Sequence, residues 1–357
     1  MKITYSFCLL LAFAISLISI KTKGQRLSTI DSIVTSAASE NYFEGTVLLA
    51  DGGSVIYQKS FGYTDASKQT PVGNSTRFGI ASITKMFTAI IIMQLVEESK
   101  LSLTDNLAEL LPGIDIPKSS KITIHHLLLH ISGLPNESDL IYQSKTSPEE
   151  FVDATLQNKS SRFEQFNYAN IDYVLLGMII ESIDGRNWQQ SVKVRILDKT
   201  GMNDTGFLGK DQYPEDFAYS FSIDPDNNRI EDPLFHIENF YAAGCMYSTA
   251  QDLLKLDQAM YGNSLLTEAS KEMMFKSYPE YNYSGYSVWT YKYPYVSPAP
   301  YIMERRGGIL GSNSALVRIL SSNKTIIILS NNNRFNPDSF GDKANLKEAL
   351  IMELTNP

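Results

Sequence analysis

Ser82 and Lys85 stand three positions apart, directly before an apolar run from Met86 to Val96. Positions i and i+3 share one face of a helix, so the lysine amine can approach the serine hydroxyl. A serine hydroxyl is a poor nucleophile until a base takes its proton, and burial lowers the pKa of a lysine enough for it to assist. The pair predicts covalent catalysis through Ser82, although an N-cap serine with a solvated lysine gives the same spacing.

A second motif, Phe166-Asn167-Tyr168-Ala169-Asn170, comes directly before an apolar stretch from Ile171 to Ile183 that ends at Gly185. The pattern predicts a buried helix, with Tyr168 and Asn170 on the loop that leads into it. A tyrosine before a helix is usually only a packed aromatic side chain. Its combination with Ser82 and Lys85 favours a catalytic role.

Ser82-x-x-Lys85 followed by Tyr168-x-Asn170 resembles the motifs of class C β-lactamases, DD-carboxypeptidases and the esterases related to them. Further stretches resemble recurrent segments of that family, so that the likeness extends from about Tyr42 to Asn332; they lie at 43–49, 61–63, 122–135 and 243–249. The resemblance implies an α/β sheet domain and a helical domain with the active site between them. It implies a serine hydrolase that acts on a peptide, ester or lactam carbonyl.

The resemblance also implies roles for individual residues. Ser82 would attack the carbonyl, Lys85 and Tyr168 would share the proton transfers, and Asn170 would bind the amide side chain of the substrate. No cofactor and no metal are expected. His126 and His130 have the i, i+4 spacing of a metal pair, but a third ligand is missing and the resemblance places both in a structural helix.

The third family element, Lys-Thr-Gly or His-x-Gly, aligns with Arg305-Arg306-Gly307. The resemblance gives Arg305 a substrate-binding role and makes the backbone N–H groups of Ser82 and Gly308 the oxyanion hole. A shift of one residue would bring Arg306 to the site instead, and both arginines could also be solvated charges on a strand. An arginine cannot exchange protons near neutral pH, so this departure disfavours efficient β-lactam hydrolysis. It also leaves open a penicillin-binding or sensor protein with little turnover.

The elements that must position these residues follow from the periodicity of both ends of the chain. Helices are predicted at 27–38 and 343–354, and strands at 45–50, 54–62, 314–320 and 324–330. These ends predict one antiparallel sheet, flanked by the N- and C-terminal helices, into which a mainly helical middle is inserted. A helix at 249–260 would start with a capping box at Ser248, and the Tyr- and Pro-rich stretch 278–301 would be an ordered loop beside the cleft or a surface excursion.

Composition limits the class of protein. The 357 residues, 43% hydrophobic, suffice for a large core, and a net charge of −8 disfavours nucleic acid as a partner, which leaves a small molecule or peptide.

Residues 1–24 have the order of a signal peptide, which predicts a secreted or periplasmic protein without a membrane span after cleavage; an uncleaved anchor is the alternative. Residues 25–357 form the hydrolase domain, with a sheet lobe at about 27–75 and 285–357 and a helical lobe at about 76–284. Cys245 is expected to be packed rather than reactive.

Overall fold

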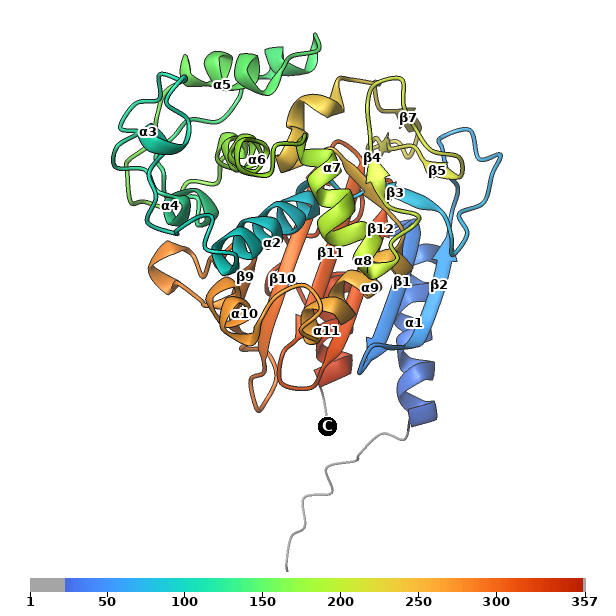
Figure 1. Ribbon diagram of the computed structural model, residues 1–357. Helices are drawn as coiled ribbons and strands as arrows, with labels where there is room; N and C mark the ends of the chain where they lie inside the picture. The colour runs from blue at the N-terminus through green and yellow to red at the C-terminus, as the bar shows by residue number, and fades with distance from the viewer. Residues whose placement is uncertain (1–22, 356–357) are drawn as a thin grey trace, which may run out of the picture.

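The protein is described by a computed structural model that covers residues 23–355 (Figure 1). The expected signal peptide therefore lies outside the described residues except for its last two positions. Those positions belong to the first helix, α1, which begins at Lys23. Within the described residues, no helix is both long and apolar enough to cross a membrane.

A six-stranded antiparallel sheet built from both ends of the chain is the centre of the fold, with strand order β2-β1-β12-β11-β10-β9. Its strands are β1 (Gly45–Asp51), β2 (Ser54–Phe61), β9 (Trp289–Lys292), β10 (Tyr301–Ile309), β11 (Ser312–Ile319) and β12 (Lys324–Ser330). β1 pairs with β12 in register from Gly45 opposite Ser330 to Asp51 opposite Lys324. The predicted meeting of the two chain ends in one sheet is confirmed.

The shorter strands form two small sheets. They are β3 (Arg77–Gly79), β4 (Gly206–Phe207), β5 (Phe217–Ala218) and β8 (Met246–Ser248) in the first, and β6 (Phe221–Ile223) and β7 (Arg229–Glu231) in the second. The α-helices are α1 (Lys23–Ser39), α2 (Thr84–Glu97), α3 (Leu107–Leu110), α4 (Ile124–Leu128), α5 (Pro148–Leu156), α6 (Asn170–Asp184), α7 (Trp188–Val192), α8 (Asp198–Thr200), α9 (Ala250–Tyr261), α10 (Glu268–Phe275) and α11 (Leu346–Thr355). Short 3₁₀ turns are η1 (Ala81–Ile83), η2 (Asp139–Tyr142), η4 (Ile237–Ala243) and η5 (Pro279–Tyr281), and η3 (Lys193–Leu197) is a π-helical turn between α7 and α8.

Alternate residues of the strands face two separate hydrophobic cores, as the two-residue period of a strand requires. On β1, Val47 and Leu49 pack with α1 and α11, whereas Leu48 packs on the opposite face, with α2 and α9. Figure 1 shows the sheet with α1 behind it and α2 in front. This is the predicted α/β arrangement, an antiparallel sheet with terminal helices and a mainly helical insertion.

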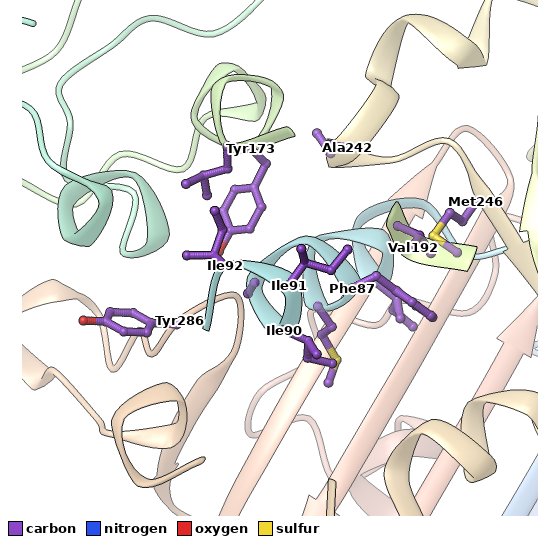
Figure 2. Packing of buried hydrophobic residues seen from close by; sticks show 14 of the residues in the cluster. Phe87, Ile90, Ile91, Ile92, Tyr173, Val192, Ala242, Met246 and Tyr286 are labelled. Atoms are coloured by element: carbon purple, nitrogen blue, oxygen red, sulfur yellow. The ribbon is translucent and has the colours of Figure 1, made fainter. Parts of the chain in front are cut away.

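α2 is the central helix of the larger core, and its residues from Thr84 to Leu95 are all buried. Figure 2 shows Ile92 beside Tyr173 of α6, and Phe87 close to Val192 and Met246. A helix that is apolar on every side must be enclosed by other elements. The core therefore holds the first turn of α2, and everything attached to it, in one position.

Three local expectations need correction. The stretch 278–301 is not only a loop, because it contains η5 and the strand β9, which pairs with β10. Helix α9 has Thr249, not Ser248, as its N-cap, and the Thr249 hydroxyl accepts a hydrogen bond from the Asp252 amide at 3.1 Å. His130 lies beyond the end of α4, with a positive φ of 59°, and therefore not in the same helix as His126.

Candidate active site

Ser82 lies in the turn η1, which leads directly into the buried helix α2. The residue before it, Ala81, has a φ of 42°, in the region that non-glycine residues rarely adopt. Such backbone strain is retained only where the surroundings enforce it, and it is concentrated at functional sites. The core under α2 thus holds the Ser82 hydroxyl in a fixed position at the start of a helix.

Lys85 is fully buried one turn after Ser82, and its amine has three hydrogen-bond acceptors. Nζ lies 3.0 Å from Ser82 Oγ, 2.7 Å from Asn170 Oδ1 and 2.9 Å from the Ala243 carbonyl oxygen. Burial lowers the pKa of the amine, with a smaller contribution in the same direction from the charge of Arg305. Three acceptors match the three donors of an ammonium group, so the contacts suit a protonated lysine that orients Ser82.

Tyr168 lies on the loop before α6 and donates its hydroxyl to Ser82 Oγ at 2.9 Å. Burial alone would raise the pKa of the phenol, but the positive charges of Arg305 and Lys85 outweigh it and hold that pKa at about 8. A phenol with this pKa is partly ionised near neutral pH, and its phenolate form can accept a proton from the serine. Ser82, Lys85 and Tyr168, predicted as a group from motifs 86 residues apart, are therefore in direct contact.

Arg305 lies on β10 and points into the same group of residues. Its Nε donates to the Ser82 carbonyl oxygen at 2.7 Å, and its Nη2 donates to the Tyr168 hydroxyl at 2.7 Å. The side chain is 1% exposed, and its guanidinium carbon lies 5.3 Å from the ring centre of Trp289. Arg306 points away from Ser82 and pairs with Asp338. Of the two arginines, Arg305 is thus the one at the site, whereas its role in binding a substrate carboxylate stays a prediction.

The part of β10 beside Ser82 is not paired with β9, because β9 pairs with β10 only from Tyr301 to Glu304. Gly307 passes so close to this turn that a Cβ there would lie 2.2 Å from the Ile80 carbonyl oxygen and 3.1 Å from the Ser82 nitrogen. Only glycine fits such an approach. Gly308 and Ser82 line one cavity of about 90 Å³, together with Asn170, Tyr142, Phe240 and Ile309. An oxyanion hole formed by the two backbone N–H groups is compatible with this arrangement.

Asn136 and Glu137 complete the site, and both were missed in the sequence because they belong to no recognised motif. Asn136 donates from Nδ2 to the Tyr168 carbonyl oxygen at 2.6 Å and accepts from the Asn170 amide at 3.1 Å. Glu137 Oε1 accepts from Asn170 Nδ2 at 2.7 Å. The only signal was their place directly after the turn Ser132-Gly133-Leu134-Pro135. Together they hold the loop that carries Tyr168 and Asn170.

His130 and Asp172 form a buried pair beneath Tyr168. His130 Nδ1 lies 3.1 Å from Asp172 Oδ2, and the rings of His130 and Tyr168 are 4.3 Å apart. Burial lowers the pKa of His130 well below its usual value and raises that of Asp172 well above, so both groups are held neutral. The described residues contain no cluster of His, Cys, Asp and Glu that could hold a metal ion. Cys245 is buried as expected, and burial raises the pKa of its thiol to about 12.

Comparison with known proteins assigns the family. A family model described as Beta-lactamase matches residues 31–351, which is most of the chain. The chain belongs to this family. Members of the Beta-lactamase family are serine hydrolases, and this protein is accordingly a serine hydrolase whose reaction proceeds at an amide, lactam or ester carbonyl.

Relatives within the family carry penicillin-binding names. Penicillin-binding protein 4* of Bacillus subtilis (strain 168) is 29% identical over 333 residues, which cover 87% of this chain and 72% of that protein. The crystal structure of a penicillin-binding protein from Bacillus halodurans matches with a TM-score of 0.72 and 26% identity, over 85% of this chain and 94% of that one. D-amino acid amidase from Ochrobactrum anthropi SV3 matches with a TM-score of 0.79 and 23% identity over 92% and 97%, a likeness that concerns the fold.

Proposed function

We propose that Ser82 is the nucleophile of this hydrolase and that Tyr168 is the base that activates it. The observation that carries the proposal is the position of Ser82 Oγ between Lys85 Nζ at 3.0 Å and Tyr168 OH at 2.9 Å. Because all three Lys85 donors have acceptors, the lysine serves as a fixed cation, while the phenol with its pKa of about 8 exchanges the proton.

The proposed reaction has two halves that use the same groups. The Tyr168 phenolate takes the Ser82 proton as Oγ forms a bond to the carbonyl carbon, and the backbone N–H groups of Ser82 and Gly308 stabilise the oxyanion. The bond to the leaving group breaks, and Tyr168 returns the proton to the departing amine or alkoxide. In the second half a water molecule attacks the acyl-enzyme, Tyr168 accepts its proton and passes it to Ser82, and the acid is released. Asn170 contacts the amide side chain of the substrate.

A D-Ala-D-Ala carboxypeptidase or an esterase is the activity proposed, in preference to an efficient β-lactamase. The departure at Arg305 supports this choice, because a buried arginine that donates to Tyr168 and to the Ser82 carbonyl cannot relay a proton as lysine or histidine could. The relatives named penicillin-binding proteins support acylation by penicillins. The signal-like residues 1–24 support export of the protein, which the mass of the mature N-terminus near Gly24 or Gln25 would test.

The proposal is tested by incubation of the protein and its Ser82→Ala variant with a fluorescent penicillin and with a fluorophosphonate, followed by intact-mass measurement. We expect one covalent adduct on the wild-type protein and none on the variant, with circular dichroism spectra that coincide. Labelling of Ser82→Ala at the wild-type rate would contradict the assignment. A wild-type protein that forms the adduct but does not hydrolyse esters or peptides would favour the alternative, a penicillin-binding or sensor protein.

A further inference from the structure

The Ala243 carbonyl that binds Lys85 belongs to η4, a segment with an unusual backbone. Tyr241, two residues earlier, has φ 42° and ψ −124° although it is not a glycine, and its side chain is buried. Such a backbone conformation is unfavourable and persists only where the surrounding contacts enforce it. After it, two successive carbonyl oxygens face α2. That of Ala242 accepts from Thr88 Oγ1 at 2.8 Å, and the next accepts from Lys85 Nζ at 2.9 Å. The conformation of Tyr241 thus sets the direction of an acceptor in the active site.

The Tyr241 side chain contacts α6 at two points that can hold this conformation. Its hydroxyl donates to Glu181 Oε1, and burial together with this bond raises the pKa of the phenol, so the group keeps its proton. Its ring lies against Gly177, where a Cβ would be 2.5 Å from Tyr241 Cε1 and 2.5 Å from Ala242 Cβ. Only glycine permits this approach. The side chain is therefore fixed on α6 both at its ring and at its hydroxyl.

Further hydrogen bonds connect this contact to α7 and α2. Glu181 Oε1 also accepts from the backbone amide of Trp188 at 2.7 Å, and Trp188 Nε1 donates to Thr88 Oγ1 at 3.2 Å. Because Thr88 in turn donates to the Ala242 carbonyl, the chain of contacts that starts at Glu181 returns to the residue after Tyr241. The side chains of Thr88 and Trp188 are fully buried. The position of η4 is thus set by α2, α6 and α7 together.

Lys85 links this arrangement to catalysis. The titratable groups that face its amine all belong to the active site; they are Tyr168, Arg305, Glu137, His130 and Asp172. The charge of Lys85 in turn contributes to the low pKa of Tyr168. Within the described part of the chain, the Tyr241 hydroxyl is hydrogen-bonded to Glu181 and not to any of these groups. Because it is also uncharged, it can affect the pKa of Tyr168 only by way of the position of Lys85.

We infer that Tyr241 is a positioning residue for catalysis, whose hydrogen bond to Glu181 holds the strained turn that directs the Ala243 carbonyl toward Lys85. When this bond is lost, the backbone relaxes, the carbonyl turns away, and Lys85 keeps only Ser82 and Asn170 as acceptors. The amine then moves away from the phenol of the proposed base. The inference rests on the proposed function, because the displacement of Lys85 is detected through the proton transfer assigned to Tyr168.

The test compares Tyr241→Phe with the wild-type protein on 4-nitrophenyl acetate, with rates expressed per active site from fluorophosphonate titration. We expect kcat/KM to fall by about tenfold or more, as suits a misplaced catalytic group. The pH above which kcat/KM levels off should also rise, because the positive charge of Lys85 is then farther from the phenol. Tyr293→Phe is the matched control. It removes another buried tyrosine–glutamate hydrogen bond, 2.7 Å long and made to Glu348 of α11, and should keep the wild-type kcat/KM and inflection.

Variants of α6 test the same bond from its other side. Glu181→Leu removes the acceptor and should reproduce the effects of Tyr241→Phe. Glu181→Gln keeps an oxygen for the Tyr241 hydroxyl and should restore most of the activity that Glu181→Leu loses. Gly177→Ala displaces η4 from α6 without changing a polar group, and it should move the inflection in the same direction.

Each other outcome speaks against the inference. If Tyr241→Phe lowers the Tm but leaves kcat/KM and the inflection unchanged, the bond is only structural and the inference is wrong. Equal losses in Glu181→Gln and Glu181→Leu would assign the effect to the charge of Glu181, and an equal loss in Tyr293→Phe would assign it to general destabilisation. Failure of the proposed function is distinguishable, since Tyr168→Phe would then keep the wild-type pH profile or Ser82→Ala would still be labelled, and the inference would fall with it.

Discussion

The Arg305 Nη2 atom donates a hydrogen bond to the Tyr168 phenol oxygen at 2.7 Å, and this contact couples the charge of a strand residue to the proposed base. A positive charge beside a phenol favours its ionised form. With Lys85, Arg305 brings the pKa of Tyr168 to about 8, against the opposite effect of burial. The arginine at the family's lysine or histidine position thus has a role that needs no proton exchange of its own.

The first prediction concerns the pH dependence of catalysis. For 4-nitrophenyl acetate, kcat/KM should rise with pH and level off above about 8, because the deprotonated Tyr168 is the active form. Arg305→Met removes the nearby charge and should move this inflection to higher pH, whereas Arg305→Lys should move it less. The measurement is a pH profile of the three proteins. An unchanged inflection in Arg305→Met would show that the guanidinium does not control the base.

The same variants test the predicted binding of a substrate carboxylate by Arg305. If that role exists, Arg305→Ala raises KM for a D-Ala-D-Ala peptide more than for a neutral 4-nitrophenyl ester. If Arg305 acts through Tyr168 alone, the loss falls on kcat and is similar for both substrates. Arg305→Lys should recover part of the activity in either case and, by restoring a family-like group, increase nitrocefin turnover.

The second prediction concerns the coupling of Lys85 and Tyr168, both of which contact Ser82 Oγ. Lys85→Ala and Tyr168→Phe should each reduce ester hydrolysis by about a hundredfold or more, the usual range for loss of general acid–base assistance. The double variant should lose little beyond the stronger single loss, because components of one proton-transfer unit fail together. A double variant whose loss equals the product of both single losses would indicate separate steps.

The sequence predicted those helices and strands in which apolar residues recur at regular intervals along the chain. The strands of both chain ends and the helix closed by Gly185 were located within a few residues, because alternation and apolar runs report burial directly. The strand β9 was not predicted, because it has only four residues, Trp289–Lys292, between turns rich in Tyr and Pro. Its pairing with β10 is a long-range contact, and so short a strand has no sequence pattern that would indicate it.

The candidate site divides in the same way. Ser82 and Lys85 were predicted from their spacing and Tyr168 from the family resemblance, and the structure brings the three side chains together, whereas their catalytic roles stay a prediction. Glu137 and Asn136 could not be predicted, since their function depends on a loop that meets Asn170 from 33 and 34 residues away in the chain. A residue that acts through such a contact has no periodic signal.

The third prediction uses the neutral pair His130 and Asp172. The lowered pKa of His130 costs stability as pH falls below about 6.5, because the unfolded chain then binds a proton that the folded chain does not, and the nearby charges of Lys85 and Arg305 add to this. The raised pKa of Asp172 has the opposite sign: its contribution is complete below about 3.8 and is lost as pH rises through the folded-state pKa.

The two single variants should therefore diverge. Between pH 7 and 5, the difference in Tm between His130→Gln and the wild type should rise as the pH falls. The difference in Tm between Asp172→Asn and the wild type should rise as the pH increases. Thermal unfolding at several pH values measures both slopes, and only the slopes matter, so a uniform loss of stability in either variant does not disturb the test. Parallel curves for both variants and the wild type would exclude a neutral pair.

The last prediction concerns the buried charges behind β10. Arg305 faces the active site, and its neighbour Glu304 faces the opposite side of the sheet, as adjacent strand residues do. There Lys347 of α11 lies 2.9 Å from Glu304 Oε2 and 3.3 Å from Glu348 Oε1, and all three side chains are buried.

Lys347→Met leaves two carboxylates without their shared cation, which should reduce the free energy of unfolding by about 3–5 kcal/mol. Glu304→Gln combined with Lys347→Met should recover part of this loss because it removes one of the two buried negative charges, that of Glu304, for which Arg306 Nε at 3.4 Å is then the remaining cationic partner. Chemical denaturation measures the unfolding free energies. Labelling of Ser82 at a temperature where Lys347→Met remains folded should persist, because the pair stabilises the strand without contacting the catalytic group. An unfolding free energy equal to that of the wild type would mean that the carboxylates find other donors or become protonated.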